Sequence, residues 1–367
     1  MAPPTPGSRD PAGRAAKRPS SGDARLPSVD PLHPGPCRLL VCALDWGLGH
    51  ATRTSVLVRR WVDQGVQVTL AGNGRSLAFW TREFPELPVR ELPDYAVTYA
   101  PGILLLPRLA LDLPRLWKVR QAEAALVASW ERDFDAVFSD NRFGCFLPGK
   151  PSWFLTHQLH LAAPRALEWG EDLGERLMAR ALRPFTEVLV PDRESGGLSG
   201  KLGHPVRPER FPPLRWIGPL SRFQDVARRD SAWSGPWDTL ALVSGPEPAR
   251  SAFESDLTRV LRHRNGRHLL VQGLPHLPLP AAPGERDGVQ TAPHLGTHDL
   301  AAALLGAKQV VTRGGYSTLM DLEALGKLDA SCVLVPTPGQ TEQEYLARHL
   351  ESERGVRWGS EGRIPSL

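Results

Sequence analysis

The stretch Gln309–Asp321, QVVTRGGYSTLMD, contains in order a short apolar run, a pair of glycines and a segment with helical character. The apolar run predicts a buried strand, since a strand covered on both faces needs no polar alternation. The glycines permit a close turn, and Ser317 is a favourable residue for the start of a helix. The same order occurs earlier, in Arg38–Gln64. A strand, a glycine turn and a helix are the repeating parts of a parallel α/β sheet.

Strands and helices alternate on both sides of a loop-rich segment in the middle of the chain. In the first part the predicted strands are 38–44, 66–71, 89–92, 135–139, 152–156 and 187–191, and the predicted helices are 51–64, 75–84 and 165–182. In the second part the predicted strands are 239–244, 268–272, 288–291, 309–312 and 332–336, and the predicted helices are 249–263, 299–305, 317–325 and 341–350. We therefore expect an α/β protein with two Rossmann-like domains whose parallel sheets face a central cleft.

The composition along the chain predicts the domain boundaries. Residues 1–36 are rich in Pro, Ser, Gly, Ala and Arg without an apolar period, which predicts a disordered tail. A transit peptide is the alternative, against which three aspartates in this segment count. Residues 37–191 are predicted to form the first Rossmann-like domain and residues 239–367 the second. Between them, residues 192–238 are dense in Pro, Gly and Arg and are predicted to be a linker or hinge.

The bulk composition excludes several classes of protein. A net charge of +4 over 367 residues is too small to indicate a nucleic-acid partner. No apolar run approaches the roughly 18 residues of a membrane span, and no apolar segment at the N-terminus indicates secretion. The four cysteines lack the spacing of a metal site, so buried or incidental thiols are expected. A cytoplasmic protein is predicted, with any membrane contact peripheral and at the inner face.

The first glycine loop places Gly47, Gly49 and His50 between a buried strand and a helix. Backbone N–H groups at such a turn can approach a ligand, and a helix N-terminus favours an anion. The third glycine of a dinucleotide fingerprint is absent, so this loop does not indicate a nicotinamide cofactor. His50 is the candidate general base, because imidazole titrates near neutral pH. The alternative is that His50 only shapes the loop by hydrogen bonding.

Polar residues follow two further strands of the first domain. Asp140, Asn141 and Arg142 come after one strand, and His157 comes after the next. Carboxyl ends of parallel strands line the ligand cleft in such folds, so these residues are predicted on the same side of the cleft as His50. Local turn capping is the alternative. His157 is a second candidate base. A metal site is not predicted, because the histidines of this region come from separate elements without acidic partners.

The second domain begins with a comparable turn, in which Gly245, Glu247 and Arg250 precede or open a helix. Backbone N–H groups and the Arg250 charge suit a diphosphate. The two prolines of the turn remove two donors, which leaves a plain proline-rich turn as the alternative.

The third turn comprises Arg313, Gly314 and Gly315 and leads into a helix that carries Ser317, Thr318 and Asp321. A carboxylate one turn into such a helix can accept hydrogen bonds from both hydroxyls of a ribose. After the next strand, the polar run Pro336–Tyr345 opens another helix and suits hydrogen bonds to sugar hydroxyls. Its candidate ligands are Gln340, Gln343 and Glu344.

These two segments together resemble the donor-binding signature of the MurG-like glycosyltransferases, enzymes of the GT-B fold with a family-28-type C-terminal domain. That family has an Arg-Ser/Gly-Gly turn, an acid six residues after the second glycine, and a proline-rich turn before a Gln-Gln/Glu-Tyr helix start. This chain has Gly315 followed by Asp321, and then Gln343-Glu344-Tyr345. The glycine loop before His50 is similar to the family's acceptor-side loop, so the resemblance extends over about residues 38–350.

The resemblance implies metal-independent transfer of a hexose or N-acetylhexosamine from a nucleoside-diphosphate sugar, with uridine diphosphate as the expected carrier, to a hydroxyl acceptor. The donor is a substrate, and no cofactor is implied. The first domain would bind the acceptor and the second the donor. Asp321 would hold the ribose, Gln343 and Glu344 the sugar, and the turns at Gly245 and Arg313, with Thr318, the diphosphate.

Three departures from the family pattern limit what the resemblance implies. Asp321 replaces the usual glutamate, Glu344 stands where MurG has a glutamine, and Pro246-Glu247-Pro248 replaces a glycine- and serine-rich phosphate loop. The sugar and the acceptor therefore remain open, and peptidoglycan precursor synthesis is not expected. An epimerase or hydrolase of the same fold and a non-catalytic nucleotide-sugar sensor are the rival hypotheses.

One segment raises the possibility of a peripheral membrane contact. Ile103–Arg120 interleaves leucines with Trp117 and basic residues, a composition that suits an interface with anionic lipid head groups. The alternative is an apolar helix packed on the sheet. Lipid acceptors of the MurG-like enzymes add weight to the membrane contact.

Overall fold

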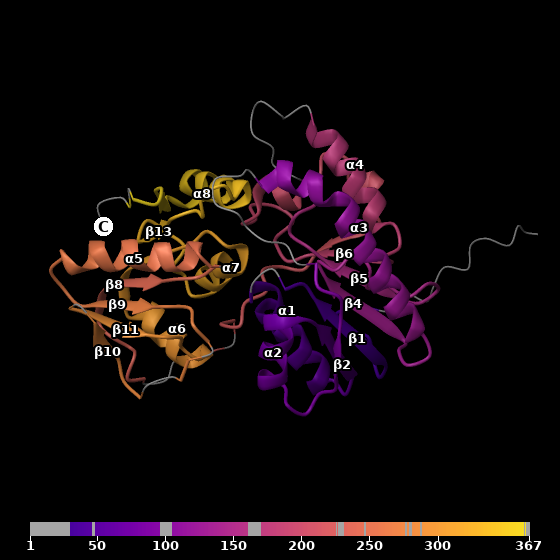
Figure 1. Ribbon diagram of the computed structural model, residues 1–367, viewed down its shortest axis with the longest axis horizontal. Helices are drawn as coiled ribbons and strands as arrows, with labels where there is room; N and C mark the ends of the chain where they lie inside the picture. The colour runs from indigo at the N-terminus through magenta and orange to yellow at the C-terminus, as the bar shows by residue number, and fades with distance from the viewer. Residues whose placement is uncertain are drawn as a thin grey trace, which may run out of the picture.

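Two seven-stranded sheets, one in each half of the chain, organise the computed structural model, and Figure 1 shows them as two lobes. The structure describes residues 30–45, 48–95, 105–160, 170–224, 226, 231–245, 247–275, 277–278, 281–286, 288–362 and 364, with side chains from residue 112 onward in the helix that begins at Leu105. The sheets contain mainly parallel strands, as the alternation of apolar runs and helices predicts.

The first sheet has the strand order β3-β2-β1-β4-β5-β6-β7, with all neighbours parallel. Its strands are β1 (Arg38–Ala43), β2 (Gln67–Gly72), β3 (Val89–Glu91), β4 (Ala136–Asp140), β5 (Ser152–Leu155), β6 (Glu187–Val190) and β7 (Leu214–Trp216). Its helices are α1 (Gly49–Asp63), α2 (Gly74–Glu83), α3 (Leu105–Ser129) and α4 (Glu171–Leu182), followed by the short 3-10 turns η2 (Gly200–Gly203) and η3 (Pro208–Arg210). The central strand β1 is almost wholly apolar and buried, because helices cover both faces.

The second sheet has the order β10-β11-β9-β8-β12-β13-β14, with only β10 and β11 antiparallel among its neighbours. Its strands are β8 (Trp237–Leu242), β9 (His268–Val271), β10 (Gly284–Arg286), β11 (Val289–Ala292), β12 (Ala307–Thr312), β13 (Cys332–Leu334) and β14 (Arg357–Trp358). Its helices are α5 (Ala249–Arg262), α6 (Thr297–Leu305), α7 (Tyr316–Ala324) and α8 (Thr341–Arg354). In both sheets a change of direction in the strand order lies beside the first strand, where such folds bind ligands.

The structure differs from the predicted elements at the sheet edges and in α3, which is not among the predicted helices, although an apolar helix is the alternative given for Ile103–Arg120. β7 lies inside the segment 192–238, for which the sequence predicts a linker, and it pairs with β6 as an edge strand. The short strands β10 and β14 are also absent from the prediction. Strands of two or three residues carry little apolar pattern, although β3, which is also three residues long, lies within the predicted strand 89–92. The helix predicted from residue 165 is described from Glu171, and residues 161–169 lie outside the described residues.

The predicted tail is described from Asp30 onward. Pro31 accepts a hydrogen bond from the indole of Trp61 at 3.0 Å, and Asp30 pairs with Arg215 at 2.9 Å. These contacts tie residues 30–36 to α1 and β7, so this part of the predicted tail is packed. Residues 1–29 lie outside the described residues.

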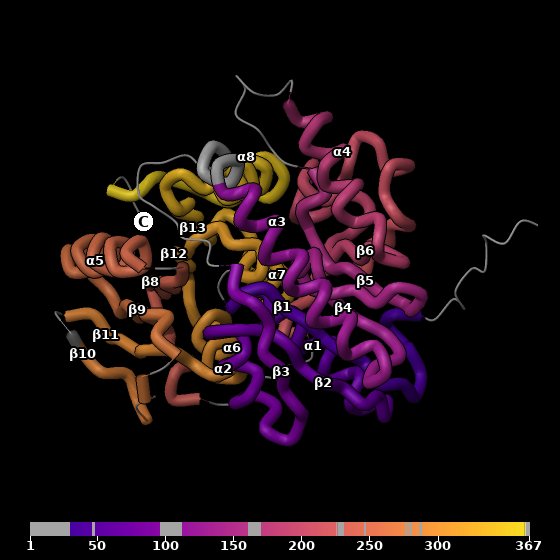
Figure 2. The backbone as a smooth tube through the Cα atoms, turned by 45° about the vertical axis from the view of Figure 1, so that its right-hand side comes forward, coloured from indigo at the N-terminus to yellow at the C-terminus, as the bar shows by residue number. Residues whose placement is uncertain are grey.

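The two lobes meet through α1 and α7, which pack against each other at the centre of the molecule (Figure 2). The largest apolar core is continuous across this junction, because it includes Trp61 and Phe138 of the first half and Tyr316 and Leu319 of the second. α8 also reaches the first half, where the Tyr345 hydroxyl accepts a hydrogen bond from a backbone N–H at 2.8 Å. The carboxyl ends of the central strands therefore lie near the domain junction.

Candidate functional site

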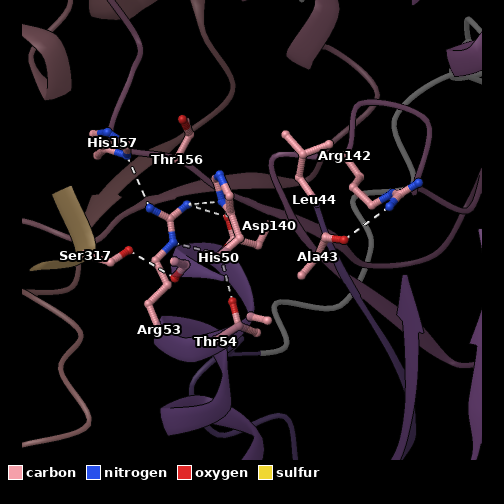
Figure 3. A network of polar contacts seen from close by, with 12 residues as sticks. Ala43, Leu44, His50, Arg53, Thr54, Asp140, Arg142, Thr156, His157 and Ser317 are labelled. Carbon is pink, nitrogen blue, oxygen red and sulfur yellow. Dashed lines mark hydrogen bonds and ion pairs between the residues drawn. The ribbon is translucent and has the colours of Figure 1, made fainter. Parts of the chain in front are cut away.

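A histidine–aspartate pair lies at the junction. β1 and β4 are in a register that puts Ala43 beside Asp140 at the carboxyl end of the first sheet. α1 begins at Gly49, shortly after β1, and carries His50 in its first turn. Nδ1 of His50 lies 2.8 Å from Oδ1 of Asp140 (Figure 3). The His50 side chain is 13% exposed, whereas the carboxylate is fully buried.

Two further residues of α1 hold the buried carboxylate. Nε of Arg53 donates to Asp140 Oδ2 at 2.8 Å, and its Nη2 donates to Oδ1. The hydroxyl of Thr54 donates to Oδ2 at 2.7 Å. Burial by itself raises the pKa of Asp140, but the Arg53 guanidinium and His50 outweigh burial and hold this pKa well below its ordinary value. Asp140 is therefore an ionised carboxylate inside the protein.

The ionised carboxylate fixes the tautomer of His50. Asp140 can only accept, so Nδ1 of His50 carries the proton and donates it. Arg53 Nη2 lies 3.1 Å from the same Nδ1, but a protonated Nδ1 cannot accept from it. Nε2 is then the nitrogen with a lone pair. Among the described residues none forms a hydrogen bond with Nε2, so this atom is available to take a proton from a ligand.

His157, the second candidate base, has both ring nitrogens in hydrogen bonds. Nδ1 lies 3.2 Å from Nη1 of Arg53, a donor, and Nε2 lies 2.9 Å from the Glu342 carboxylate. Burial lowers the pKa of His157 in spite of the opposing effect of Glu342. The ring is therefore neutral, with a bare Nδ1 and a protonated Nε2. It also stacks on Tyr316 with the ring centroids 4.0 Å apart. These contacts suit a residue that connects Arg53 to Glu342 better than they suit a general base.

Glu342, in the first turn of α8, is a residue that the sequence analysis does not identify. Its second carboxylate oxygen accepts a hydrogen bond from the Gln158 amide at 2.6 Å. Burial raises its pKa, but the hydrogen bond from His157 and the nearby Arg53 guanidinium outweigh burial, and the pKa is lowered overall. The sequence signal is the polar run in which Glu342 directly precedes Gln343. Successive residues of a helix point in different directions, so the run alone cannot say which carboxylate crosses the junction.

The N-termini of α1 and α7 meet at the junction. Ser317 Oγ donates to the carbonyl oxygen of Gly49 at 3.0 Å (Figure 3). A Cβ at Gly49 would lie 2.7 Å from this hydroxyl, so only glycine fits here without a shift. Gly315 is the N-cap of α7, and Thr318 is half-buried in its first turn. Gly47 lies outside the described residues. The N-terminus of a helix carries a partial positive charge, so the two N-termini that meet here favour an anionic ligand.

The two donor-binding segments of the sequence analysis lie together. A Cβ at Gly314 would be 3.4 Å from the backbone oxygen of Gln343, so the glycine turn packs directly on the start of α8. The Gln343 side chain accepts from the backbone N–H of Thr337 at 2.8 Å and donates to the side chain of Gln340. Gln343 and Gln340 thus shape the proline-rich turn. Glu344 is partly exposed and lies 3.9 Å from Arg348.

Asp321, the predicted ribose ligand, contacts the segment between the two sheets. Its carboxylate accepts a hydrogen bond from Ser221 Oγ at 2.7 Å and lies 3.4 Å from Arg222. Burial raises its pKa above the ordinary value, although both neighbours oppose this. These contacts already use part of the hydrogen-bond accepting capacity of the Asp321 carboxylate. The hydroxyls of a ribose would therefore bind beside Ser221 and Arg222 or replace them.

The side chain of Arg313 points away from the glycine turn that it precedes. It is buried, donates to the backbone oxygens of Ala249, Val335 and Pro336, and pairs with Glu361. Its charge therefore ties α5 to the end of β13. Only the backbone of this turn remains to face a diphosphate.

The charge of Arg250 is also taken up by neighbours. Its Nε lies 2.5 Å from Glu247, and Nη1 lies 2.7 Å from Glu254 and donates to a backbone oxygen. Hydrogen bonding to Arg250 lowers the pKa of Glu247, which is therefore ionised. Gly245 has a φ of 106° and is open on its Cβ side. The turn thus presents a backbone accessible to a ligand, beside a neutralised arginine.

Arg142, predicted on the acceptor side of the cleft, does not join His50. Its guanidinium is fully buried, lies 2.6 Å from Glu123 and 2.8 Å from Asn73, and is 5.5 Å from the centre of the Tyr95 ring. This cluster links α3 to the sheet. Asn141 adopts a positive φ of 58°, which turns the chain sharply between Asp140 and Arg142 and sends their side chains in different directions.

Neither a metal-binding cluster nor a membrane-spanning helix is found in the part of the chain that the structure describes. There, no group of three or more His, Cys, Asp or Glu side chains has an arrangement suited to a metal ion. Over the same residues, none of the helices combines the length and apolar character needed to cross a membrane.

Comparisons with known proteins place the chain by its fold. No protein-family model matches the sequence, and no curated protein matches it either. Among solved structures, MurG from Acinetobacter baumannii matches with a TM-score of 0.52 and 13% identity over 90% of this chain and 87% of that one. The glycosyltransferase SnogD from Streptomyces nogalater gives 0.56 and 18% over 90% and 88%. UGT89C1 from Arabidopsis thaliana, complexed with UDP-L-rhamnose, gives 0.52 and 12% over 89% and 86%. The chain therefore has the GT-B fold of glycosyltransferases, which confirms the predicted fold class and resemblance.

Proposed function

We propose that this protein is a glycosyltransferase that moves a sugar from a nucleoside-diphosphate donor to a hydroxyl acceptor, with His50 as the general base. The observation that carries the proposal is the His50–Asp140 pair at the junction of two Rossmann-like domains. The His50 ring is held at Nδ1 by Asp140, and no residue that the structure describes forms a hydrogen bond with Nε2. The complex of UGT89C1 with UDP-L-rhamnose supports a nucleotide sugar as the class of donor for this fold.

The chemistry follows from the protonation state of the pair. The acceptor hydroxyl gives its proton to Nε2 of His50 while its oxygen bonds to the anomeric carbon of the sugar. The bond between that carbon and the diphosphate oxygen breaks, and the nucleoside diphosphate leaves with the bonding electrons. Asp140 stabilises the imidazolium that forms, because it already accepts from Nδ1. Arg53 keeps Asp140 ionised and in place.

The donor is assigned to the second domain. The backbone of the Gly314–Gly315 turn and the N-terminus of α7 would stabilise the leaving diphosphate, so no metal ion is needed for that step. Asp321 would bind the ribose, and the start of α8, with Gln343 and Glu344, would bind the sugar. A uridine diphosphate hexose or N-acetylhexosamine is the proposed donor, on the resemblance to MurG-like enzymes.

The rival epimerase or hydrolase would need free carboxylates near the reacting carbon. Asp45 accepts hydrogen bonds from the start of α2, where its Oδ2 lies 3.1 Å from the N–H of Arg75. Asp140 is buried and fully engaged, and Glu247 pairs with Arg250. These three carboxylates, which an epimerase or hydrolase could use, thus have structural partners, which supports transfer over epimerisation.

The decisive experiment follows the fate of the donor. We expect nucleoside diphosphates and their sugars to raise the Tm of the full chain, and product to form only when a hydroxyl acceptor is present. His50→Ala should lower turnover about 100- to 10,000-fold while the Tm shift with the donor remains. His263→Ala, which removes an exposed imidazole at the end of α5, is the matched control. Tm shifts without turnover on any acceptor would support the sensor instead, and loss of turnover with EDTA would contradict a metal-independent reaction.

A peripheral membrane contact is the second part of the proposal. Leu113 and Trp117 on α3 are 57% and 53% exposed, and Leu173 and Leu177 on α4 are each 56% exposed. α3 and α4 are neighbours in both views of the molecule (Figures 1 and 2). Exposed basic residues accompany the apolar ones, among them Lys118, Arg176 and Arg180. Such a surface suits an interface with anionic lipid.

Vesicle binding tests this contact. The protein should sediment with vesicles that contain phosphatidylglycerol and much less with pure phosphatidylcholine. Replacing Leu113 and Trp117 together by serine should abolish sedimentation without changing the Tm, since both side chains are exposed. Equal binding by the variant, or no binding to either vesicle, would contradict the proposal.

A further inference from the structure

A continuous chain of polar contacts runs from α8 in the second domain to the base in the first. Glu342 accepts from Nε2 of His157 at 2.9 Å, and Nδ1 of His157 lies 3.2 Å from Nη1 of Arg53. Arg53 donates two hydrogen bonds to Asp140, and Asp140 accepts a third from Nδ1 of His50. Figure 3 shows Arg53 between His157 on one side and the His50–Asp140 pair on the other.

The donor and acceptor pattern of this chain is consistent only in one arrangement. Arg53 is always a donor, so Nδ1 of His157 must be bare to accept from it. A neutral imidazole with a bare Nδ1 has its proton on Nε2, and Glu342 is the acceptor for that proton. The carboxylate of Glu342 therefore selects the tautomer of His157 that Arg53 requires.

The second domain holds His157 in another way as well. Tyr316, the first residue of α7, stacks on the imidazole at an interplanar angle of 4°. Its hydroxyl donates to the backbone oxygen of Pro191 at 3.0 Å, so the phenol ring is anchored in the first domain. Gln158 donates to the other oxygen of Glu342. The position of His157 thus depends on two helices of the donor domain.

We infer that Glu342 is a positioning residue, which through His157 and Arg53 aligns the Asp140–His50 pair when the donor domain is seated on the acceptor domain. The inference rests on the proposed function for the role of His50. It adds that the base is assembled by contacts from both domains. Without Glu342, His157 can carry its proton on Nδ1 and would then present a second donor to Nη1 of Arg53, so the guanidinium loses the acceptor that orients it beside Asp140.

Two substitutions of Glu342 separate this role from others. Glu342→Ala removes the acceptor, and we expect kcat to fall about 10- to 100-fold while the KM for the donor changes less than about threefold. Glu342→Gln keeps an acceptor oxygen for Nε2 of His157, and the Gln158 amide can rotate to suit it, so kcat should return to within about threefold of the natural enzyme. Glu353→Ala is the control, because Glu353 is exposed on the same helix.

The outcomes distinguish three roles. A rise in donor KM with kcat unchanged would make Glu342 a sugar ligand and overturn the inference. A lower Tm with unchanged kcat in Glu342→Ala would make Glu342 a purely structural residue and would also overturn the inference. Equal losses in the Gln and Ala variants would contradict selection of the tautomer, since the amide oxygen can replace the carboxylate in that role.

A measurement independent of activity keeps the inference separate from the proposed function. In ¹⁵N-histidine NMR spectra of the full chain, His157 should show the tautomer with the proton on Nε2. The spectrum of Glu342→Ala should show a mixture of the two His157 tautomers, or mainly the form with the proton on Nδ1. The spectrum of Glu353→Ala should match that of the natural protein. An unchanged His157 signal in Glu342→Ala would overturn the inference. Absence of turnover in the natural enzyme, with the expected change in the spectrum, would contradict only the proposed glycosyl transfer.

Discussion

The first strand-to-helix turns of the two domains have the same place in the fold but opposite electrostatics. After β1, the helix α1 supplies His50 and Arg53, which converge on the buried Asp140. After β8, the helix α5 supplies Arg250, which pairs with Glu247 and Glu254 beside its own helix. In the first turn Arg53 keeps the Asp140 carboxylate ionised, and that carboxylate holds His50. In the second turn two carboxylates neutralise the charge of Arg250.

A residue type at a favourable turn therefore does not define its role. What matters is where the partner of each arginine comes from. Asp140 reaches Arg53 from another strand, so the contact builds a site between elements. Glu247 and Glu254 lie three residues before and four residues after Arg250, so these ion pairs are local to the start of α5.

The sharpest test of this comparison is Asp140→Asn. The amide can donate to Nδ1 of His50 and so favour the wrong tautomer, and it no longer balances Arg53. We expect kcat to fall about 100-fold or more, with a lower Tm because a buried charge loses its partner. Steady-state kinetics and thermal unfolding measure both effects, and Asp133→Asn, at an exposed ion pair, is the control. Unchanged kcat would mean that Asp140 has no part in positioning the base.

Asp321→Asn tests the predicted ribose contact in the second domain. If the carboxylate binds the ribose hydroxyls, the KM for the donor should rise about tenfold with a smaller change in kcat. Titration calorimetry with the nucleoside diphosphate should show the same loss. Because Asp321 also accepts from Ser221, a Tm decrease with unchanged donor affinity would make it an anchor of the interdomain segment only.

The pH dependence of stability tests the buried state of His157. Burial lowers its pKa below the ordinary 6.5, with Arg53 and His50 adding to the effect and Glu342 opposing it. Below pH 6.5 the unfolded chain takes up a proton that the folded chain resists, so this contribution to stability is present above 6.5 and is lost as the pH falls.

His157→Gln lacks this titration. The variant should be less stable by about 1–3 kcal/mol near neutral pH, because Arg53 and Glu342 lose a partner. The difference in unfolding free energy between the two proteins should narrow on acidification from about pH 7.5 to about pH 5.5. Denaturant unfolding at several pH values measures this difference. A constant difference would show that His157 titrates alike in the folded and unfolded chains.

The smallest expected effect is that of Glu247→Gln. Removing this exposed carboxylate leaves Arg250 less neutralised, which should strengthen binding of the nucleoside diphosphate about two- to fivefold at low salt. The gain should shrink as the ionic strength rises. Weaker or unchanged binding would indicate that the diphosphate does not approach this turn, and would leave the start of α7 as the anion site.

The sequence predicts most of the fold because its signals are local. Apolar runs followed by glycine turns identify the central strands, and Figure 1 shows these strands in the two predicted sheets. Of the short strands that are missed, β10 pairs with the adjacent β11 but is too short to show an apolar pattern, whereas β7 and β14 pair with strands that are distant in the sequence. The packing of residues 30–36 is missed for the same reason, because Trp61 and Arg215 supply the contacts.

For the site, the sequence indicates which residues could carry chemistry, and it predicts His50, Asp140 and His157 at the ends of neighbouring elements. The contacts of these residues follow from the tertiary structure. It oriented His50 by Asp140, made His157 a link to Glu342, and turned Arg142 and Arg313 into buried structural residues. The physical reason is that a tautomer or an ionisation state depends on partners within about 3 Å, and these partners come from strands and helices that only folding brings together.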